Sequence, residues 1–163
     1  MRPCNPRLIN PASVDLCLGG TFRDFYNPVW IHPIRERIKL FPDYTVYKWV
    51  NRLSALLGDV PAYPTYIMAI TYEFVKLPTN LAGEVKMKTT PTREGLAQVI
   101  ADWVDPGYEG RLTLILHAIK PVEISYKERI CQLVLMNVDG DTTSYAEKGH
   151  YMHQNHPTLS WRN

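Results

Sequence analysis

The sequence lacks long apolar runs and has little net charge, and both absences limit what the protein does. No apolar stretch approaches the ~18 residues that a membrane span needs, and residues 1–15 lack the apolar core of a secretion signal. With 18 Lys and Arg against 16 Asp and Glu, the net charge is only +2. So small an excess does not favour binding to nucleic acid or to a membrane surface. We expect a cytosolic protein that binds neither.

Cysteine is also scarce, which bears on disulfides and on catalysis. Cys4, Cys17 and Cys131 are widely spaced, odd in number and form no CxxC pair. This pattern does not indicate a disulfide framework. Apolar, strand-like residues flank Cys17 and Cys131, so we expect both to be buried, reduced thiols.

Helical patterns are few, whereas short strand-like segments recur between the 13 prolines. These segments are rich in β-branched and aromatic residues and are bounded by turn-forming residues. They predict an all-β sandwich or barrel. Apolar residues recur at helical spacing over residues 43–58, and one helical turn is expected within residues 92–103. Residues 22–58 as a whole are expected to be an insertion or excursion of mixed character. The expected strands are 9–20, 65–77, 83–90, 111–119, 122–126 and 129–138.

The chain of 163 residues fits one domain with a sizeable core. We find no internal repeat, low-complexity tract or linker, and so predict a single domain over residues 1–163.

A short polar segment places two cations beside three hydroxyls. Lys88, Thr89, Thr90, Thr92 and Arg93 fall within six residues around a proline. Hydroxyls, backbone N–H groups and a planar guanidinium suit an oxyanion such as phosphate. A polar surface loop explains the composition equally simply, and composition alone favours that interpretation.

An acidic turn precedes the strand at 111–119. Asp105 begins Asp-Pro-Gly-Tyr, a good turn sequence, and Asp102 lies three residues before it. Such a turn can hold a carboxylate at fixed geometry, although the sequence of the turn alone does not establish a site.

The C-terminal segment repeats histidine. His150, His153 and His156 recur at every third residue, which raises the hypothesis of a metal site. Asn155 and Pro157 oppose a regular helix, and neither Cys nor a carboxylate completes a ligand set. We therefore predict no protein metal ligands here. The segment is interpreted as closing over a ligand or bridging subunits, or alternatively as a mobile tail.

Five segments, taken in order, resemble the successive motifs of the dCTP deaminase/dUTPase superfamily. They read INPASVDLCLG, VKLPTNLAGEVKMKTTPTREGL, WVDPGYEGRLTLIL, KERICQLV and HYMHQ, and they cover most of the chain outside residues 22–58. The resemblance implies a distorted jelly-roll β-barrel with one or two short helices. It also implies a homotrimer, active sites at subunit interfaces, and a deoxynucleoside triphosphate substrate with Mg²⁺ bound to its phosphates.

The resemblance assigns roles to individual residues. Asp105 lies near the deoxyribose 3′-hydroxyl and orients or deprotonates the attacking water, and Tyr108 packs under the sugar. The strand backbone around Thr113 and Ile115 reads the base. The remaining residues are matched to phosphate binding or to closure of the tail over the phosphates. The phosphate group is Lys88, Thr89, Thr90, Arg93 and Gln132, and the tail group is Tyr145, His150 and Gln154.

One departure from the deaminase pattern concerns the chemistry. The resemblance places a proton-shuttling Glu where this sequence has Ile115, and an aliphatic side chain cannot move a proton. No Cys/His set offers a zinc site instead. dUTPases carry an aliphatic residue at this position. The main functional prediction is therefore hydrolysis of dUTP to dUMP and diphosphate, with Asp105 as the catalytic residue.

Two alternatives remain open. In the first, the protein binds a nucleotide or a protein partner without turnover; the lost Glu, His150 in place of Lys, and the absent glycine-rich dUTPase tail motivate it. In the second, dCTP is deaminated by a displaced acid. The compact, motif-altered chain also suits a virus-encoded copy acting in the host cytoplasm.

Overall fold

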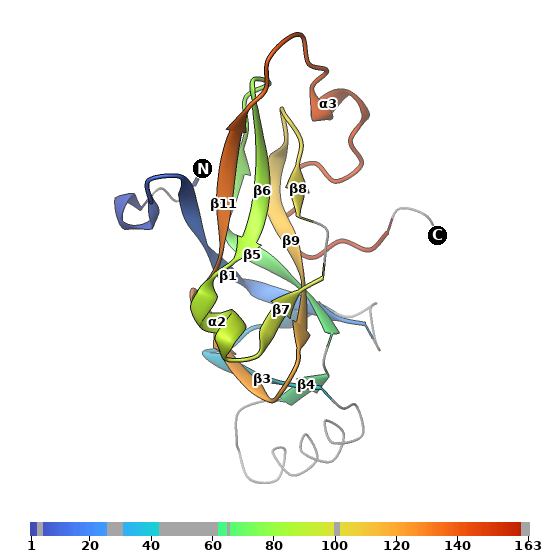
Figure 1. Ribbon diagram of the computed structural model, residues 1–163. Helices are drawn as coiled ribbons and strands as arrows, with labels where there is room; N and C mark the ends of the chain where they lie inside the picture. Colours follow the sequence, from blue (N-terminus) through green and yellow to red (C-terminus); the bar gives the residue numbers. More distant parts are fainter. Residues whose placement is uncertain (3–4, 26–30, 43–61, 65, 100–101, 161–163) are drawn as a thin grey trace.

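The structure is a computed structural model, and it describes residues 1–2, 5–25, 31–42, 62–64, 66–99 and 102–160 (Figure 1). The described strands form an eight-stranded sheet in the order β7-β9-β5-β1-β11-β6-β8, with β2 beside β1, and a smaller sheet in the order β10-β3-β4. All strand pairs are antiparallel except β3 with β4. The elements are η1 (Pro6–Leu8), β1 (Ser13–Asp24), β2 (Ile31–Pro33), β3 (Arg37–Phe41), β4 (Ala62–Pro64), β5 (Tyr66–Lys76), β6 (Leu81–Met87), α2 (Thr89–Arg93), β7 (Leu96–Gln98), β8 (Trp103–Val104), β9 (Glu109–Ala118), β10 (Val122–Ser125), β11 (Arg129–Asn137) and α3 (Tyr145–Lys148).

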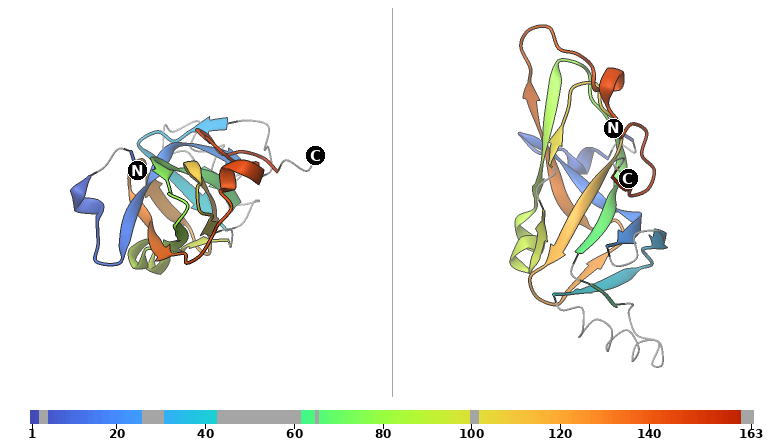
Figure 2. Two further views of the ribbon diagram at one scale, coloured as in Figure 1. Left: turned by 90° about the horizontal axis from the view of Figure 1, so that it is seen from above. Right: turned by 90° about the vertical axis from the view of Figure 1, so that its right-hand side faces the viewer.

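The long strand β1 makes the large sheet curl. Its first half pairs with β11 and its second half pairs with β5, with register shifts between Leu16 and Cys17 and between Leu18 and Phe22. Such irregularities increase the local twist and bend the strand. The sheet consequently curves around its apolar face into an elongated half-barrel, seen from two further directions in Figure 2.

The core lies inside this curl and follows from strand periodicity. In β9, residues alternate regularly between buried and half-buried, so that Leu112, Leu114 and Leu116 face the core. Phe22 and Leu16 of β1 and Ile130 of β11 are completely buried in the same core cluster. The alternate residues of β9 point to the opposite face of the strand, where they are only half-buried.

The predicted all-β class with short helices is confirmed, and so are most of the predicted strands. The segments 65–77, 83–90, 111–119, 122–126 and 129–138 correspond to β5, β6, β9, β10 and β11. The first strand runs from Ser13 to Asp24, later than expected, because residues 6–8 form a 3-10 turn.

Two predictions of local structure are wrong, and one falls outside the described residues. The helical turn expected within 92–103 is formed earlier, as α2, and Leu96–Gln98 is a strand because it pairs with the edge of β9. The described residues within 22–58 continue β1 and form β2 and β3, so they are part of the sheets and not an excursion from them. The predicted helix at 43–58 lies outside the described residues.

Cys17 and Cys131 are buried free thiols, as expected. Burial is the main cause that raises the pKa of the Cys17 thiol to about 12, with the nearby Glu73 carboxylate adding to it. Among the helices that the structure describes, none is long and apolar enough to cross a membrane.

Candidate nucleotide-binding pocket

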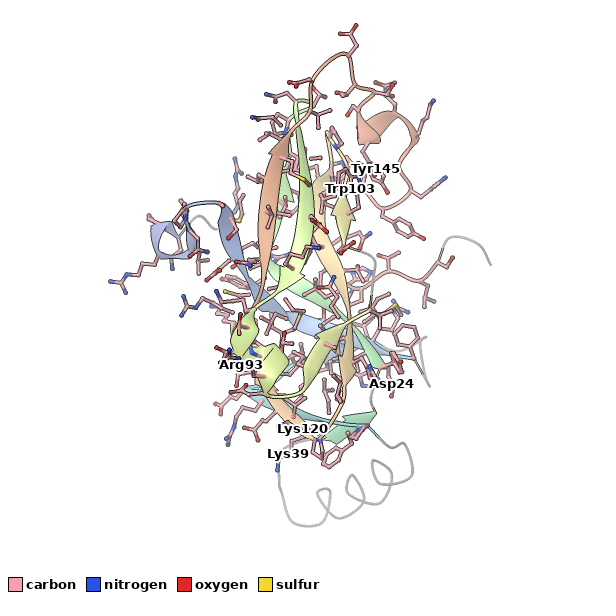
Figure 3. All side chains as sticks on the ribbon, viewed as in Figure 1. Asp24, Lys39, Arg93, Trp103, Lys120 and Tyr145 are labelled. Carbon is pink, nitrogen blue, oxygen red and sulfur yellow. The ribbon has the colours of Figure 1, made fainter. Side chains whose placement is uncertain are left out.

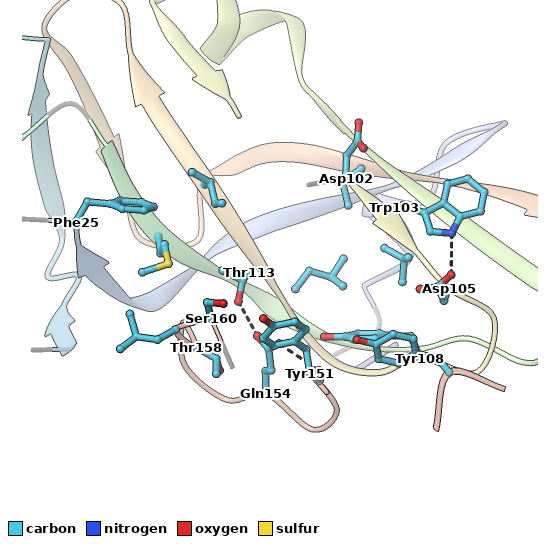
Figure 4. Close-up of a pocket in the computed structure, with 17 residues that line it drawn as sticks. Phe25, Asp102, Trp103, Asp105, Tyr108, Thr113, Tyr151, Gln154, Thr158 and Ser160 are labelled. Atoms are coloured by element: carbon cyan, nitrogen blue, oxygen red, sulfur yellow. Dashed lines mark hydrogen bonds between the residues drawn. The ribbon is translucent and has the colours of Figure 1, made fainter. Parts of the chain in front are cut away.

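A pocket of about 860 Å³ opens beside β8 and β9 and beneath the C-terminal segment (Figure 4). Its size lies within the range of small-molecule sites, and its wall combines aromatic and aliphatic side chains with a few polar groups. The lining residues that matter below are Asp102, Trp103, Asp105, Tyr108, Thr113, Ile115, Tyr145, Tyr151 and Gln154.

A tight turn fixes the acid at the edge of this pocket. The Tyr108 N–H donates to the Asp105 carbonyl at 3.1 Å, and Gly107 between them has a φ of +78°. That left-handed conformation at the third turn position favours glycine. The Asp105 carboxylate then accepts a hydrogen bond from Trp103 Nε1 at 2.9 Å. Asp105 is therefore anchored through both its backbone and its side chain.

Tyr108 is held by the same turn and closes one end of the pocket. Its hydroxyl donates to the Arg111 carbonyl at 2.7 Å, and its ring lies 5.7 Å from that of Tyr145. Only 7% of the side chain is exposed, and this burial, followed by the neighbouring Tyr145, raises the pKa of the Tyr108 hydroxyl. The ring thus presents a fixed, uncharged surface to a ligand.

Strand alternation brings Thr113 and Ile115 to the pocket face of β9. Both are half-buried between the core leucines, and both line the cavity. The Thr113 hydroxyl donates to Gln154 Oε1 at 2.6 Å. The position where the deaminase pattern expects a Glu therefore faces the pocket and carries the aliphatic side chain of Ile115.

The C-terminal segment is docked along the free edge of β9. The Arg111 N–H donates to the Gln154 carbonyl at 3.0 Å, and the His153 N–H donates to the Glu109 carbonyl at 2.7 Å. A side chain at Gly110 would meet the backbone nitrogen of Gln154 at 3.0 Å, so this close approach requires glycine. The segment consequently forms one wall of the pocket.

The structure brings half of the predicted site residues together. Asp105, Tyr108, Thr113, Ile115, Tyr145 and Gln154 all line this one pocket. His150 belongs to the same segment but is not among the lining residues. The roles assigned to these residues remain predictions.

The predicted phosphate-binding residues lie elsewhere on the chain. Lys88 precedes α2, Thr89, Thr90 and Arg93 lie within it, and none of these residues lines the pocket. In Figure 3, Arg93 is at one side of the molecule and Trp103 and Tyr145 are at the other. The segment is also helical: the Thr92 N–H donates to the Lys88 carbonyl and the Glu94 N–H donates to the Thr90 carbonyl, so Thr89 and Thr90 lie in the first turn of a short helix and not in an extended loop.

The buried carboxylate of Asp15 contacts several of the polar residues around Lys88. Asp15 on β1 is 1% exposed and accepts hydrogen bonds from Lys88 Nζ at 2.8 Å and Asn10 Nδ2 at 2.9 Å. Its other oxygen lies 3.4 Å from Arg129 Nη1. Gln132, opposite Asp15 in the β1–β11 register, accepts from the Ser13 hydroxyl. Lys88 and Gln132 are thus neighbours on one part of the sheet.

Replacing Asp15 by Asn is expected to lower the free energy of unfolding by about 2 kcal/mol. The change leaves Lys88 and Arg129 beside a neutral amide, and breaking a buried ion pair costs ~3–5 kcal/mol before the partial exposure of both cations is discounted. Urea denaturation measures the loss. The matched control is Glu123→Gln, which breaks an exposed pair with Arg37 and should cost less than ~0.5 kcal/mol. Equal losses in the two variants would contradict this role for Asp15.

Sequence reasoning missed several residues of both groups. Trp103 and Tyr151 line the pocket, and Asp15 and Arg129 form the ion pairs around Lys88. Trp103 lies two positions before Asp105, on the same side of an extended chain, which was an available signal. The contacts of Asp15 with Lys88 and Arg129 depend on strand pairing between distant segments and left no local signal.

The described residues hold no cluster of three or more His, Cys, Asp or Glu side chains that could bind a metal ion. Mg²⁺ needs few protein ligands because it retains water and binds substrate phosphates. The expected Mg²⁺ bound to the phosphates of a substrate therefore stays a prediction.

A curled antiparallel sheet with an aromatic pocket, an anchored acid and a covering C-terminal segment defines a mostly-β half-barrel protein with a candidate small-molecule site. The family model described as dCTP deaminase-like matches residues 1–138, and the chain belongs to this family.

Curated relatives and a solved structure agree with this assignment. A "dCTP deaminase, dUMP-forming" from Nanoarchaeum equitans is 34% identical over 161 residues, covering 91% of this chain and 81% of the relative. One of the same description from Acidothermus cellulolyticus is 35% identical, covering 99% and 86%. The crystal structure of 2′-deoxycytidine 5′-triphosphate deaminase from Agrobacterium tumefaciens matches with a TM-score of 0.58 and 14% identity, which shows the fold. That match covers 88% of this chain but only 44% of the solved chain.

The descriptions of these relatives support some of the functional predictions more strongly than others. They support membership of the dCTP deaminase-like family and a place in pyrimidine deoxynucleotide metabolism. They agree better with the alternatives based on an altered dCTP deaminase than with a plain dUTPase.

Proposed function

We propose that this chain is an altered dCTP deaminase-like protein that binds a pyrimidine deoxynucleoside triphosphate and hydrolyses dUTP to dUMP and diphosphate without deaminating cytosine. The proposal rests on two side chains that line the pocket. Ile115 stands there in place of a proton-shuttling acid, while Asp105 is present and anchored. The pocket thus keeps a group for hydrolysis and lacks the expected one for deamination.

The hydrolytic step needs only one base near the reacting water. The water oxygen attacks the α-phosphorus, the bond from that phosphorus to the bridging oxygen breaks, and diphosphate leaves. Asp105 accepts the proton of the attacking water or orients it. Tyr108 supports the sugar, and the backbone around Thr113 meets the base edge.

The phosphate-binding group is proposed to come from another copy of the chain. Lys88 and Arg93 carry positive charge suited to a triphosphate, yet they do not line the pocket that contains Asp105. A homotrimer with the pocket of one subunit facing α2 of the next would join the two groups. Mg²⁺ bound to the phosphates would neutralise the charge that develops on them.

The test separates hydrolysis from deamination by product. The purified protein is incubated with magnesium and either dUTP or dCTP, and the products are resolved by ion-exchange chromatography. We expect dUTP to yield dUMP and diphosphate, and dCTP to remain unchanged. If dUTP binds but persists, the protein binds nucleotide without turnover and the hydrolytic assignment is wrong.

Deamination of dCTP by a displaced acid is the second candidate. Two observations favour it: the relatives are described as dUMP-forming dCTP deaminases, and Asp102 is a second carboxylate in the pocket wall. Asp102 also lies 3.8 Å from Lys86 Nζ, so its carboxylate is partly engaged by a cation. Formation of dUMP or dUTP from dCTP, abolished by Asp102→Asn, would establish this activity.

A further inference from the structure

We propose that Trp103 is a positioning residue for Asp105, holding one carboxylate oxygen so that the other faces the substrate. The inference rests on the proposed function, because it assigns the orientation of the acid on which hydrolysis depends. It concerns a residue that the resemblance did not assign.

The first observation is the contact between the two side chains. Trp103 Nε1 donates to Asp105 Oδ1 at 2.9 Å, and both residues line the pocket (Figure 4). An indole N–H is a single, rigidly placed donor. It fixes the rotation of the carboxylate and uses one of its two oxygens. The remaining oxygen, Oδ2, is then the acceptor available to a water molecule or a sugar hydroxyl.

The second observation is the exposure of the Trp103 side chain. It is 57% exposed, whereas a large aromatic side chain that stabilises a core is mostly buried. Trp103 lies on the short strand β8 opposite Glu84 of β6, so its backbone position is set by strand pairing and not by packing of the ring. Core packing therefore does not explain the placement of the indole against Asp105.

The third observation is the charge of the donor. In the part of the chain that the structure describes, the Asp105 carboxylate makes no ion pair, whereas Asp15 is flanked by Lys88 and Arg129. A neutral indole orients a carboxylate without offsetting its negative charge. The donor that orients Asp105 therefore places no positive charge beside the carboxylate that is proposed to receive the proton of a water molecule.

Loss of the indole N–H is the decisive change. Trp103→Phe retains an aromatic ring and should lower kcat for dUTP hydrolysis about 10-fold while changing KM by less than about twofold, since misplacement of a catalytic group chiefly affects the reacting geometry. The matched control is Tyr126→Phe, which removes the polar hydrogen of an exposed aromatic side chain outside the pocket. This control should leave both constants unchanged, and thermal unfolding should show both variants folded.

A double-mutant cycle distinguishes positioning from direct contact with the ligand. The kcat for dUTP hydrolysis is measured for the wild type, Trp103→Phe, Asp105→Asn and the double variant, and binding of α,β-imido-dUTP, which resists hydrolysis, is measured by calorimetry for the same four proteins. If Trp103 acts through Asp105, Trp103→Phe lowers kcat in the wild type but not in the Asp105→Asn background, and it changes the affinity for the analogue by less than about twofold in either. Additive losses would overturn the inference, because Trp103 would then contact the nucleotide by itself.

The remaining outcomes separate this inference from the proposed function. If the wild type hydrolyses dUTP and Trp103→Phe matches it in kcat and in binding, the inference alone is overturned. If the wild type neither binds the analogue nor hydrolyses dUTP, the proposed function fails, and the inference fails with it.

Discussion

Asp105→Asn is expected to lower the rate of dUTP hydrolysis at least ~100-fold, the usual contribution of a well-placed general base. The substitution keeps the size of the side chain and its capacity to accept a hydrogen bond from Trp103. It removes the negative charge that accepts or attracts the proton of water. Initial rates of diphosphate release, measured at saturating dUTP and magnesium, would show the loss in kcat.

Asp139→Asn is the control for this experiment. Asp139 is exposed in the segment between β11 and α3 and does not line the pocket, so the same chemical change there should leave the rate unchanged. Full hydrolysis by the Asp105→Asn protein would show that another group activates the water. The assignment of Asp105 as the catalytic residue would then be wrong.

The second large effect is recovery of activity when two inactive variants are mixed. Asp105→Asn alters the pocket, whereas Arg93→Ala alters α2, and these sites lie apart on one chain (Figure 3). If each active site combines the pocket of one subunit with α2 of another, random mixing restores one intact combination in four. Co-refolded variants should therefore reach about one quarter of the wild-type activity.

The control for the mixture is the same pair of variants combined without refolding. Subunits that have not exchanged should stay inactive, and the recovery should follow the time course of subunit exchange. If co-refolded mixtures remain as inactive as either parent, the cations of α2 do not complete the pocket of a neighbour. The homotrimer with shared sites would then be rejected as the active assembly.

Most of the sheet could be predicted from local patterns. Segments such as RLTLILHA alternate between buried and half-buried positions, and that period specifies an extended strand with one buried face. Pairing was less predictable. The segment KERICQLVL could be an edge strand by composition, yet β11 lies in the interior of the sheet between β1 and β6. The helix α2 was misplaced by a few residues because strand β7 takes the following segment through its pairing with β9.

The site was predictable as a set of residue types, but not as an arrangement. The order of motifs indicated Asp105, Tyr108 and Ile115 because the turn and the strand that carry them are continuous in sequence. The inability of Ile115 to transfer a proton likewise follows from its residue type alone. The sequence by itself therefore determined the strands, the acidic turn and the aliphatic replacement at position 115.

Only the tertiary structure decided which of these residues share a pocket. The Thr113–Gln154 bond and the burial of Asp15 beside Lys88 join segments tens of residues apart, and they arise from strand pairing and from docking of the C-terminal segment. The separation of α2 from the pocket follows from the curl of the sheet, which carries the two groups to different sides. The two-residue spacing of Trp103 and Asp105 permits their hydrogen bond, but the bond also depends on the orientation of an exposed side chain, which the spacing does not specify.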